Sequence, residues 1–373
     1  MKKVGIMTFH RSHNCGSIME SFAIQKTIEK LGYKNELINF SSPGQRDMYY
    51  VFSKKKKFKK YVKNILVSPF YKTLSRHYND YKSFIEKNLV LSDGDYKSED
   101  ELKKISDNYD IYIAGSDQIW NITIPDYDIS YFLSFVNNKK KIAYAPSFGS
   151  KNILKYSDNP QQYIDLFNDF NNLSIRENNG KKWLEEMTGR EVPVVLDPTL
   201  LVDKEEYYKL ENESGISGDY IFYYSPQYKG DINKFVKKLS KKYKMPVIVW
   251  NSKEYAIKGL YKYGFKMAFH QDPGVYLDLI KNAKMVITTS FHGTIFSTIY
   301  RKKFWVMKNG DMYGEDDRVI TLLNQLEMMD RLIEPQFNID FNYNKEVDYS
   351  EYDNKLPELQ KKSLDYLKKA LDE

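Results

Sequence analysis

Residues 288–297 read Thr-Thr-Ser-Phe-His-Gly-Thr-Ile-Phe-Ser. The apolar run Met285–Ile287 before it predicts a short buried strand. Residues Thr294–Tyr300 after it predict a helix, so His292 is expected in a strand-to-helix turn. The free N–H groups and positive dipole end of a helix favour an anion at such a turn. His292 is therefore either a proton donor to an anionic substrate or a residue that only caps the helix.

Length and composition indicate a two-domain protein. The chain has 373 residues, of which 42% are hydrophobic, which is more than one ordinary core holds. No run of eighteen apolar residues occurs, so no transmembrane helix is expected. The single cysteine, Cys15, excludes a disulfide framework within the chain and suits a reducing compartment, so we expect a cytoplasmic location.

The charge distribution favours an anionic partner. Lys and Arg number 57 against 50 Asp and Glu, a formal net charge of +7. Nucleic acid is not expected, because the charges are mostly well mixed and no recognition motif is present. The densest basic run, Lys54–Lys60, is either a solvated helix face or a patch that meets anionic lipid head groups or a pyrophosphate. The second interpretation would bring the protein to the inner face of the membrane.

The N-terminal residues predict the opening of a doubly wound sheet. The strand Val4–Phe9, the helix Ile18–Leu31 and the strand Glu36–Phe40 form a β-turn-α-β unit. The first turn lacks the G-x-G-x-x-G pattern, so no nicotinamide site is indicated. Cys15 in this turn is either a nucleophile or a small residue packed against the backbone.

Polar residues follow each of the next predicted strands. These strands are expected at 110–114, 141–145, 172–175 and 192–196. Polar residues at successive strand ends are typical of the carboxyl edge of a parallel sheet, where such folds bind ligands. The loop 115–121 combines Gly, Ser, Asp, Gln, Trp and Asn, which indicates a ligand loop. Its Trp120 either stacks on a sugar or packs beneath the loop.

A second strand-helix alternation begins at residue 220, so we predict three segments. Residues 1–205 form an N-terminal domain that carries a basic, helical insertion at about 41–108. Residues 206–350 form a C-terminal domain. Residues 351–373 form a helix, because apolar side chains recur there at helical spacing, and this helix is expected to pack back on the first domain.

The motifs, taken in order, resemble those of the polysaccharide pyruvyl transferase family. The matching pieces span nearly the whole chain and are residues 14–17, 115–121, 144–149, 174–177, 196–199 and 290–293. The resemblance implies an α/β fold with two Rossmann-like domains that face across a cleft, similar to the GT-B-like glycosyltransferases. It also implies transfer of a pyruvyl group from phosphoenolpyruvate to sugar hydroxyls as a ketal, on a precursor of a cell-surface polysaccharide such as a capsule or exopolysaccharide.

The resemblance also implies roles for individual residues. His292 corresponds to the acid that protonates the donor, and Arg176 to a residue that clamps the donor and stabilises charge. The C-terminal domain is the donor side, and the donor is expected to contact Ser290, Gly293, Thr294, Arg318 and Lys303. The N-terminal domain is the acceptor side, and a sugar, free or lipid-linked, is expected to contact Asn14, Gly16, Ser17, Ser116, Asp117, Gln118, Trp120 and Ser147. No metal and no cofactor is expected.

One position departs from the family pattern. Many members have Arg two residues before the His, and Ser290 stands there in this chain. This departure favours one alternative, a non-catalytic glycan-binding accessory protein. A second alternative, a nucleotide-sugar-dependent glycosyltransferase, stays open because its architecture would look alike.

Overall fold

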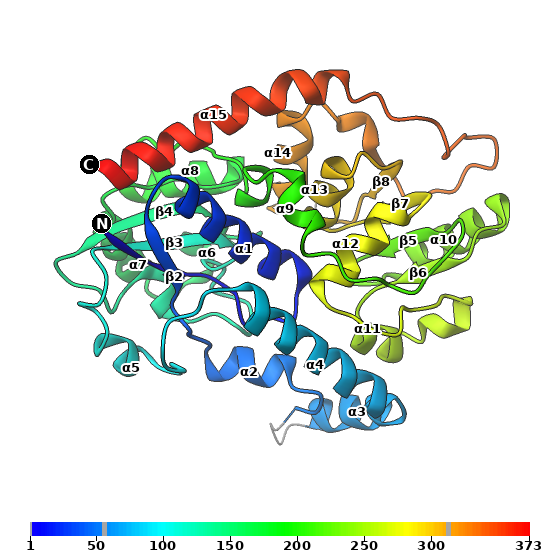
Figure 1. Ribbon diagram of the computed structural model, residues 1–373, viewed down its shortest axis with the longest axis horizontal. Helices are drawn as coiled ribbons and strands as arrows, with labels where there is room; N and C mark the ends of the chain where they lie inside the picture. The colour runs from blue at the N-terminus through cyan, green and yellow to red at the C-terminus, as the bar shows by residue number, and fades with distance from the viewer. Residues whose placement is uncertain (1, 54–57, 311–314) are drawn as a thin grey trace.

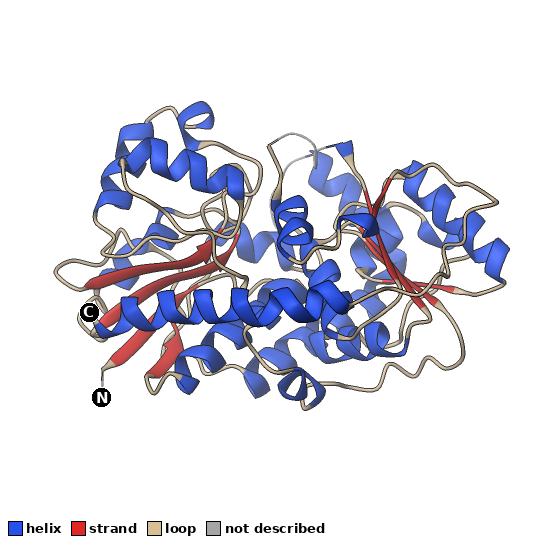
Figure 2. Ribbon diagram, turned by 90° about the horizontal axis from the view of Figure 1, so that it is seen from above, coloured by secondary structure: helices blue, strands red, loops and turns tan. Residues whose placement is uncertain are grey.

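The computed structural model describes residues 2–53, 58–310 and 315–373. Lysines 54–57 of the predicted basic patch lie outside the described residues. Two parallel sheets stand at opposite ends of the molecule, and helices cover their faces (Figures 1 and 2). No helix in the described part of the chain is long and apolar enough to cross a bilayer.

The first sheet has the order β2-β1-β3-β4. All pairings between its named strands are parallel, with Val4 opposite Asn35 on one side and Ile111 on the other. Its strands are β1 (Lys3–Met7), β2 (Lys34–Leu37), β3 (Ile111–Asp117) and β4 (Lys140–Pro146). The helices of this part of the chain are α1 (Cys15–Lys30), α2 (Pro43–Tyr49), α3 (Phe58–Val67), α4 (Tyr71–Asn88), α5 (Glu99–Lys103), α6 (Ile153–Tyr156), α7 (Pro160–Asn168) and α8 (Asn178–Thr188).

The second sheet has the order β6-β5-β7-β8-β9 and is also parallel between its named strands. Its strands are β5 (Ile221–Tyr224), β6 (Val247–Val249), β7 (Met285–Thr288), β8 (Phe304–Met307) and β9 (Leu332–Ile333). The helices that lead into this sheet, surround it and follow it are α9 (Lys204–Tyr208), α10 (Gly230–Tyr243), α11 (Ser252–Ile257), α12 (Pro273–Asn282), α13 (Phe291–Ile299), α14 (Arg318–Gln325) and α15 (Ser350–Asp372).

Two predicted strands are replaced by single bridges. The segments 172–175 and 192–196 join the first sheet only through the pairs Ile142–Asn172 and Ile175–Val194. The Ser174 hydroxyl group donates to the Ala143 carbonyl and accepts from the Ala145 N–H, so a side chain makes hydrogen bonds that a backbone ladder would otherwise make. In the second sheet, a single bridge likewise joins Ile248 and Lys266.

Helix α15 crosses from the second sheet to the first, and the chain termini lie at the same end of the molecule (Figures 1 and 2). The Ser363 hydroxyl group accepts from the Leu196 N–H at 2.9 Å, and the Tyr366 hydroxyl group donates to the Ala143 carbonyl at 3.0 Å. Leu367 is fully buried. The helix therefore closes the core beside β4.

Truncating this contact tests how far α15 supports the fold. We expect Leu367→Ala to lower the free energy of unfolding by about 2–5 kcal/mol, because it leaves a cavity in a closed core. The exposed neighbour provides the control: Lys368→Ala should change the value by less than about 0.5 kcal/mol. Urea denaturation of both variants measures the difference, and equal values would show that α15 is only peripheral.

Candidate active site

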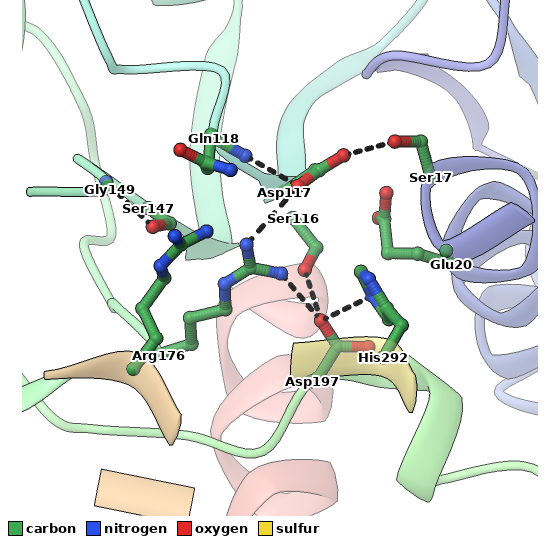
Figure 3. A network of polar contacts seen from close by, with 12 residues as sticks. Ser17, Glu20, Ser116, Asp117, Gln118, Ser147, Gly149, Arg176, Asp197 and His292 are labelled. Atoms are coloured by element: carbon green, nitrogen blue, oxygen red, sulfur yellow. Dashed lines mark hydrogen bonds and ion pairs between the residues drawn. The ribbon is translucent and has the colours of Figure 1, made fainter. Parts of the chain in front are cut away.

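The carboxyl ends of the central strands of both sheets meet at one site. In each sheet the strand order reverses, between β1 and β3 and between β5 and β7, and α/β sheets bind ligands outside such switch points. Helix α1 follows β1, Asp117 ends β3, and α13 follows β7. Side chains from all three positions enter one polar network (Figure 3).

Arg176 joins two carboxylates in the centre of this network. Its Nη1 donates to Asp197 Oδ2 at 2.8 Å, and its Nη2 donates to Asp117 Oδ1 at 3.2 Å. The guanidinium also lies over the Phe291 ring, with Cζ 4.6 Å from the ring centroid. Only 3% of Arg176 is exposed. Both of its terminal nitrogens are thus engaged by protein carboxylates, an arrangement that a free donor clamp would not have.

The backbone and helix α1 orient Asp117. Asp117 has φ 65°, a left-handed conformation that costs a non-glycine residue about 1–3 kcal/mol. Its Oδ1 accepts from the Gln118 N–H at 2.8 Å, and its Oδ2 accepts from the Ser17 hydroxyl group. These bonds hold the carboxylate toward Arg176.

Helix α13 begins at Phe291, three residues before the predicted start at Thr294, so His292 lies in the first turn of the helix rather than in the turn before it. Ser290 caps this helix, because its side chain accepts from the Gly293 N–H at 3.2 Å. The His292 Nε2 lies 3.5 Å from Asp197 Oδ2. His292 and Arg176, from opposite domains, therefore share one carboxylate oxygen.

Gly16 makes this approach of the two domains possible. A Cβ built on Gly16 would lie 2.9 Å from the Cβ of His292 and would overlap its imidazole ring. Residue 16 must therefore lack a side chain. The predicted role of Gly16 as an acceptor contact becomes a packing role in this structure.

Electrostatics keep the two central carboxylates ionised. Burial by itself would raise the pKa of Asp197, but His292, Arg176 and the Thr199 hydroxyl group hold it well below its ordinary value. The pKa of Asp117 is lowered too, because Arg176, His292 and Ser17 outweigh its burial. The site thus fixes two negative charges beside one guanidinium and one imidazole.

Two buried glutamates at the rim of the network behave in the opposite way. Burial raises the pKa of Glu177 to about 8, and burial together with Asp197 and Asp117 raises that of Glu20 well above its ordinary value. Glu20 Oε2 accepts from the Thr8 hydroxyl group at 3.0 Å, and Glu177 Oε1 accepts from the Phe148 N–H at 2.8 Å. Burial thus favours the neutral form of both carboxyl groups, and Glu177, with a pKa of about 8, is mostly protonated near pH 7.

Two predicted contacts lie away from the network. Trp120 is fully buried against Phe132, Phe148 and other aromatic rings, so it packs beneath its loop and offers no face to a sugar. Lys303 precedes β8 at the amino end of the sheet and pairs with Glu346 at 2.5 Å. Parallel strands place their amino ends on the opposite edge from the site, which is why Lys303 cannot reach it.

The remaining predicted donor residues differ in accessibility. Gly293 and Thr294 are buried: a Cβ on Gly293 would overlap Thr288, and the Thr294 hydroxyl group donates to the Ser290 carbonyl. Arg318 begins α14 and makes a two-point pair with Asp316, at 2.8 and 2.7 Å. Its charge acts on Glu177, so it lies near the network rather than in it.

The remaining predicted acceptor residues are likewise mostly engaged in the fold. Ser116 is fully buried and donates to Asp197 Oδ2 at 3.0 Å, while Ser147, also buried, accepts from the Gly149 N–H at 2.9 Å. Gln118 is half-buried. Asn14 caps α1 by accepting from the Gly16 N–H at 2.9 Å.

A pocket of about 340 Å³ opens beside the network. Asn14, Cys15 and Tyr224 line it together with rings from both domains, among them Tyr49, Tyr78, Tyr81 and Trp250. The Tyr81 hydroxyl group lies 2.9 Å from the Cys15 thiol and accepts from the Trp250 indole at 3.1 Å. Burial raises the pKa of the Cys15 thiol, so this residue is a neutral packing group rather than a nucleophile.

Sequence reasoning did not assign a role to Asp197 or to the aromatic lining. Asp197 follows a predicted strand, as the other polar motifs do, and this position could have marked it as a site residue. The pocket rings come from segments far apart in the chain, so no local signal marks them. Within residues 2–53, 58–310 and 315–373, no group of three or more His, Cys, Asp or Glu side chains is arranged to hold a metal ion.

Comparison with known proteins identifies the family. A family model described as polysaccharide pyruvyl transferase matches residues 14–311, most of the chain. The chain belongs to the polysaccharide pyruvyl transferase family. This confirms the resemblance seen in the motifs and assigns the protein to a family of transferases that act on polysaccharides. No curated protein matches the sequence significantly.

Solved structures confirm the fold class. S. aureus MnaA, in a co-structure with UDP, is similar with a TM-score of 0.53 and 11% identity, covering 100% of this chain and 97% of that chain. UDP-N-acetylglucosamine 2-epimerase from Rickettsia bellii gives a TM-score of 0.50 at 11% identity, with the same coverage. At this identity the likeness concerns the fold alone, which is the GT-B-like pair of Rossmann domains.

The neutral state of Glu177 predicts a pH-dependent stability. Its pKa of about 8 lies above the ordinary value of 4.5, so the folded protein binds a proton that the unfolded chain loses above pH 4.5. Stability therefore falls as the pH rises from about 5 to 8. Glu177→Gln keeps the acceptor for the Phe148 N–H and should lose this dependence.

Urea denaturation at pH 5 and pH 8 measures the effect. The free energy of unfolding of Glu177→Gln, relative to that of the unsubstituted protein, should be higher at pH 8 than at pH 5. A difference that does not change with pH would show that Glu177 is ionised in the folded state.

Proposed function

We propose that this protein transfers the pyruvyl group of phosphoenolpyruvate to two hydroxyl groups of a sugar, with formation of a ketal and release of phosphate. The observation that carries the proposal is that His292 and Arg176, from opposite domains of a member of this family, meet at the Asp197 carboxylate. A site closed by both domains can hold donor and acceptor together and limit access of water.

His292 is the proposed acid. The reaction requires a proton at C3 of the donor, which makes C2 electrophilic toward a sugar hydroxyl group. Attack by that hydroxyl forms one C–O bond at C2 and passes its proton to the imidazole. Attack by the second hydroxyl forms the other C–O bond and breaks the bond between C2 and the phosphate oxygen, and its proton leaves with the phosphate. The Asp197 carboxylate, with Oδ2 3.5 Å from His292 Nε2, would stabilise the protonated form of the imidazole. The imidazole gives its proton to C3 and regains one from the attacking hydroxyl group.

Arg176 is proposed as a positioning residue. Because its Nη groups hold Asp117 and Asp197, it fixes the carboxylate that faces His292 and balances the charge around it. The donor anion is proposed at the start of α13, where Ser290 and His292 lie beside the positive end of the helix dipole.

The acceptor sugar is proposed in the aromatic pocket. Half-buried Tyr49 and Tyr78 provide flat apolar faces, and Asn14 provides an amide at the end nearest Gly16 and His292. A volume of about 340 Å³ is within the range of ligand pockets.

Removal of the proposed acid is the direct test. His292→Ala should lower turnover with phosphoenolpyruvate by about 10²–10⁴-fold, the usual worth of general acid catalysis. Donor binding should be affected less than turnover, because the proton transfer matters mainly in the transition state. Phosphate release with a panel of sugar acceptors measures turnover, and calorimetry measures donor binding. Near-normal turnover would leave His292 as a helix-start residue only.

The same assay separates the alternatives. A glycosyltransferase would release a nucleotide from a nucleotide sugar and no phosphate from phosphoenolpyruvate. An accessory protein would bind glycan and release neither.

Gly16 offers an independent test that leaves all polar groups in place. We expect Gly16→Ala to lower turnover by about 10²-fold or more, because the added methyl group displaces the His292 ring from Asp197. The matched control is Gly115→Ala in β3, where a Cβ would meet Ile6 at an ordinary 3.4 Å. If both variants kept normal turnover, the position of the imidazole would not matter to the reaction.

A further inference from the structure

Helix α3 has its apolar face turned toward solvent. Phe58 is 81% exposed, Tyr61 64%, Ile65 54% and Leu66 50%. A surface helix of a globular protein normally buries its apolar stripe and exposes its charges. In α3 the arrangement is reversed, since the buried residue of the helix is Val67, while Lys60 and Asn64 are only partly exposed.

The spacing of side chains makes this a continuous face. Positions 58, 61, 62, 65 and 66 lie on one side of a helix with 3.6 residues per turn. The other side carries Lys60, Lys63, Asn64 and Val67, which line the aromatic pocket. The helix thus separates the pocket from the exterior, and its outer side is the apolar one. We call residues 58, 61, 62, 65 and 66 the outer face of α3.

The charge around the outer face is positive. Of the described residues between Asp47 and Asp80, Lys59, Lys60, Lys63, Lys72 and Arg76 are basic and none is acidic, and Lys60 pairs with Asp47 at 3.5 Å. Lys59 lies beside the outer face and is exposed, and Lys72 follows on α4. Figure 1 shows α3 at the periphery of the molecule, below α4.

We propose that the outer face of α3 docks on an anionic lipid bilayer, with its apolar side chains at the level of the acyl chain boundary and the flanking lysines at the head groups. An amphipathic helix with large apolar residues on one side and lysines beside them has the composition of an interfacial membrane helix. Basic residues add to this attraction to anionic lipid. A second copy of the chain is a poorer occupant, because two such faces would bring two basic segments together.

The placement has a consequence for the pocket. A helix is about 10 Å across, so a membrane that contacts the outer face lies about that distance from the pocket that the inner side of α3 lines. This docking does not rest on the proposed chemistry. If the acceptor is lipid-linked, docking holds the membrane that carries it within about that distance of the pocket.

Vesicle co-sedimentation of the full chain tests the proposal. The protein should sediment with vesicles of phosphatidylglycerol and phosphatidylcholine, and much less with phosphatidylcholine alone, with binding that falls as salt is added. The triple variant Phe58→Ser, Ile65→Ser, Leu66→Ser keeps every charge and should bind at least about tenfold more weakly. Lys59→Glu should weaken binding severalfold at low salt.

A matched control removes equally exposed apolar residues elsewhere. Val90 and Ile339 are 60% and 62% exposed, and the double variant Val90→Ser, Ile339→Ser should bind like the unsubstituted protein. Equal vesicle binding by the triple variant and this control would overturn the proposal. Absence of binding to anionic vesicles at low salt would overturn it as well. A dimer in sedimentation velocity that the triple variant abolishes, without vesicle binding, would assign the outer face to a second copy instead. Phosphate release in solution is measured separately, so failure of the proposed reaction is distinguishable from failure of docking.

Discussion

The buried carboxylate of Asp197 is the constraint on which the site depends. An ionised carboxylate removed from water is costly unless it is paired and hydrogen-bonded. Arg176, Ser116 and Thr199 from its own domain and His292 from the other supply that compensation. The relative position of the two domains at the site is therefore tied to the charge of one side chain.

The four acidic residues at and around this site differ in the charge state that their surroundings favour. Cationic groups favour the ionised forms of Asp117 and Asp197, whereas burial favours the neutral forms of Glu20 and Glu177. If all four were ionised, the Arg176 guanidinium and the imidazole would face four negative charges, while the nearby Arg318 is already paired with Asp316. Burial thus limits the negative charge of the network, which favours an anionic ligand nearby.

The α2–α4 segment has a separate role in the architecture. It supplies one wall of the aromatic pocket, and α11 of the second domain supplies part of the other. The same segment carries the exposed apolar face of α3. A single insertion in the first domain therefore shapes a proposed acceptor pocket on one side and a proposed membrane contact on the other.

The two strand-helix alternations, the polar strand ends and the family could be predicted from the sequence alone. These features are local: a buried parallel strand must be apolar along its length, and a binding loop must follow its carboxyl end. The single bridges at 172–175 and 192–196 were beyond this reasoning, because the Ser174 side chain takes over backbone hydrogen bonds there.

Which groups meet is known only from the packed structure. It placed Arg176 between two carboxylates, buried Trp120 among aromatic rings, and put Lys303 on the opposite sheet edge. It also turned the apolar face of α3 outward. A sequence pattern records that a helix has an apolar side or that a residue carries charge. Which partner covers that side or neutralises that charge depends on contacts between residues far apart in the chain, and those are fixed only when the domains pack.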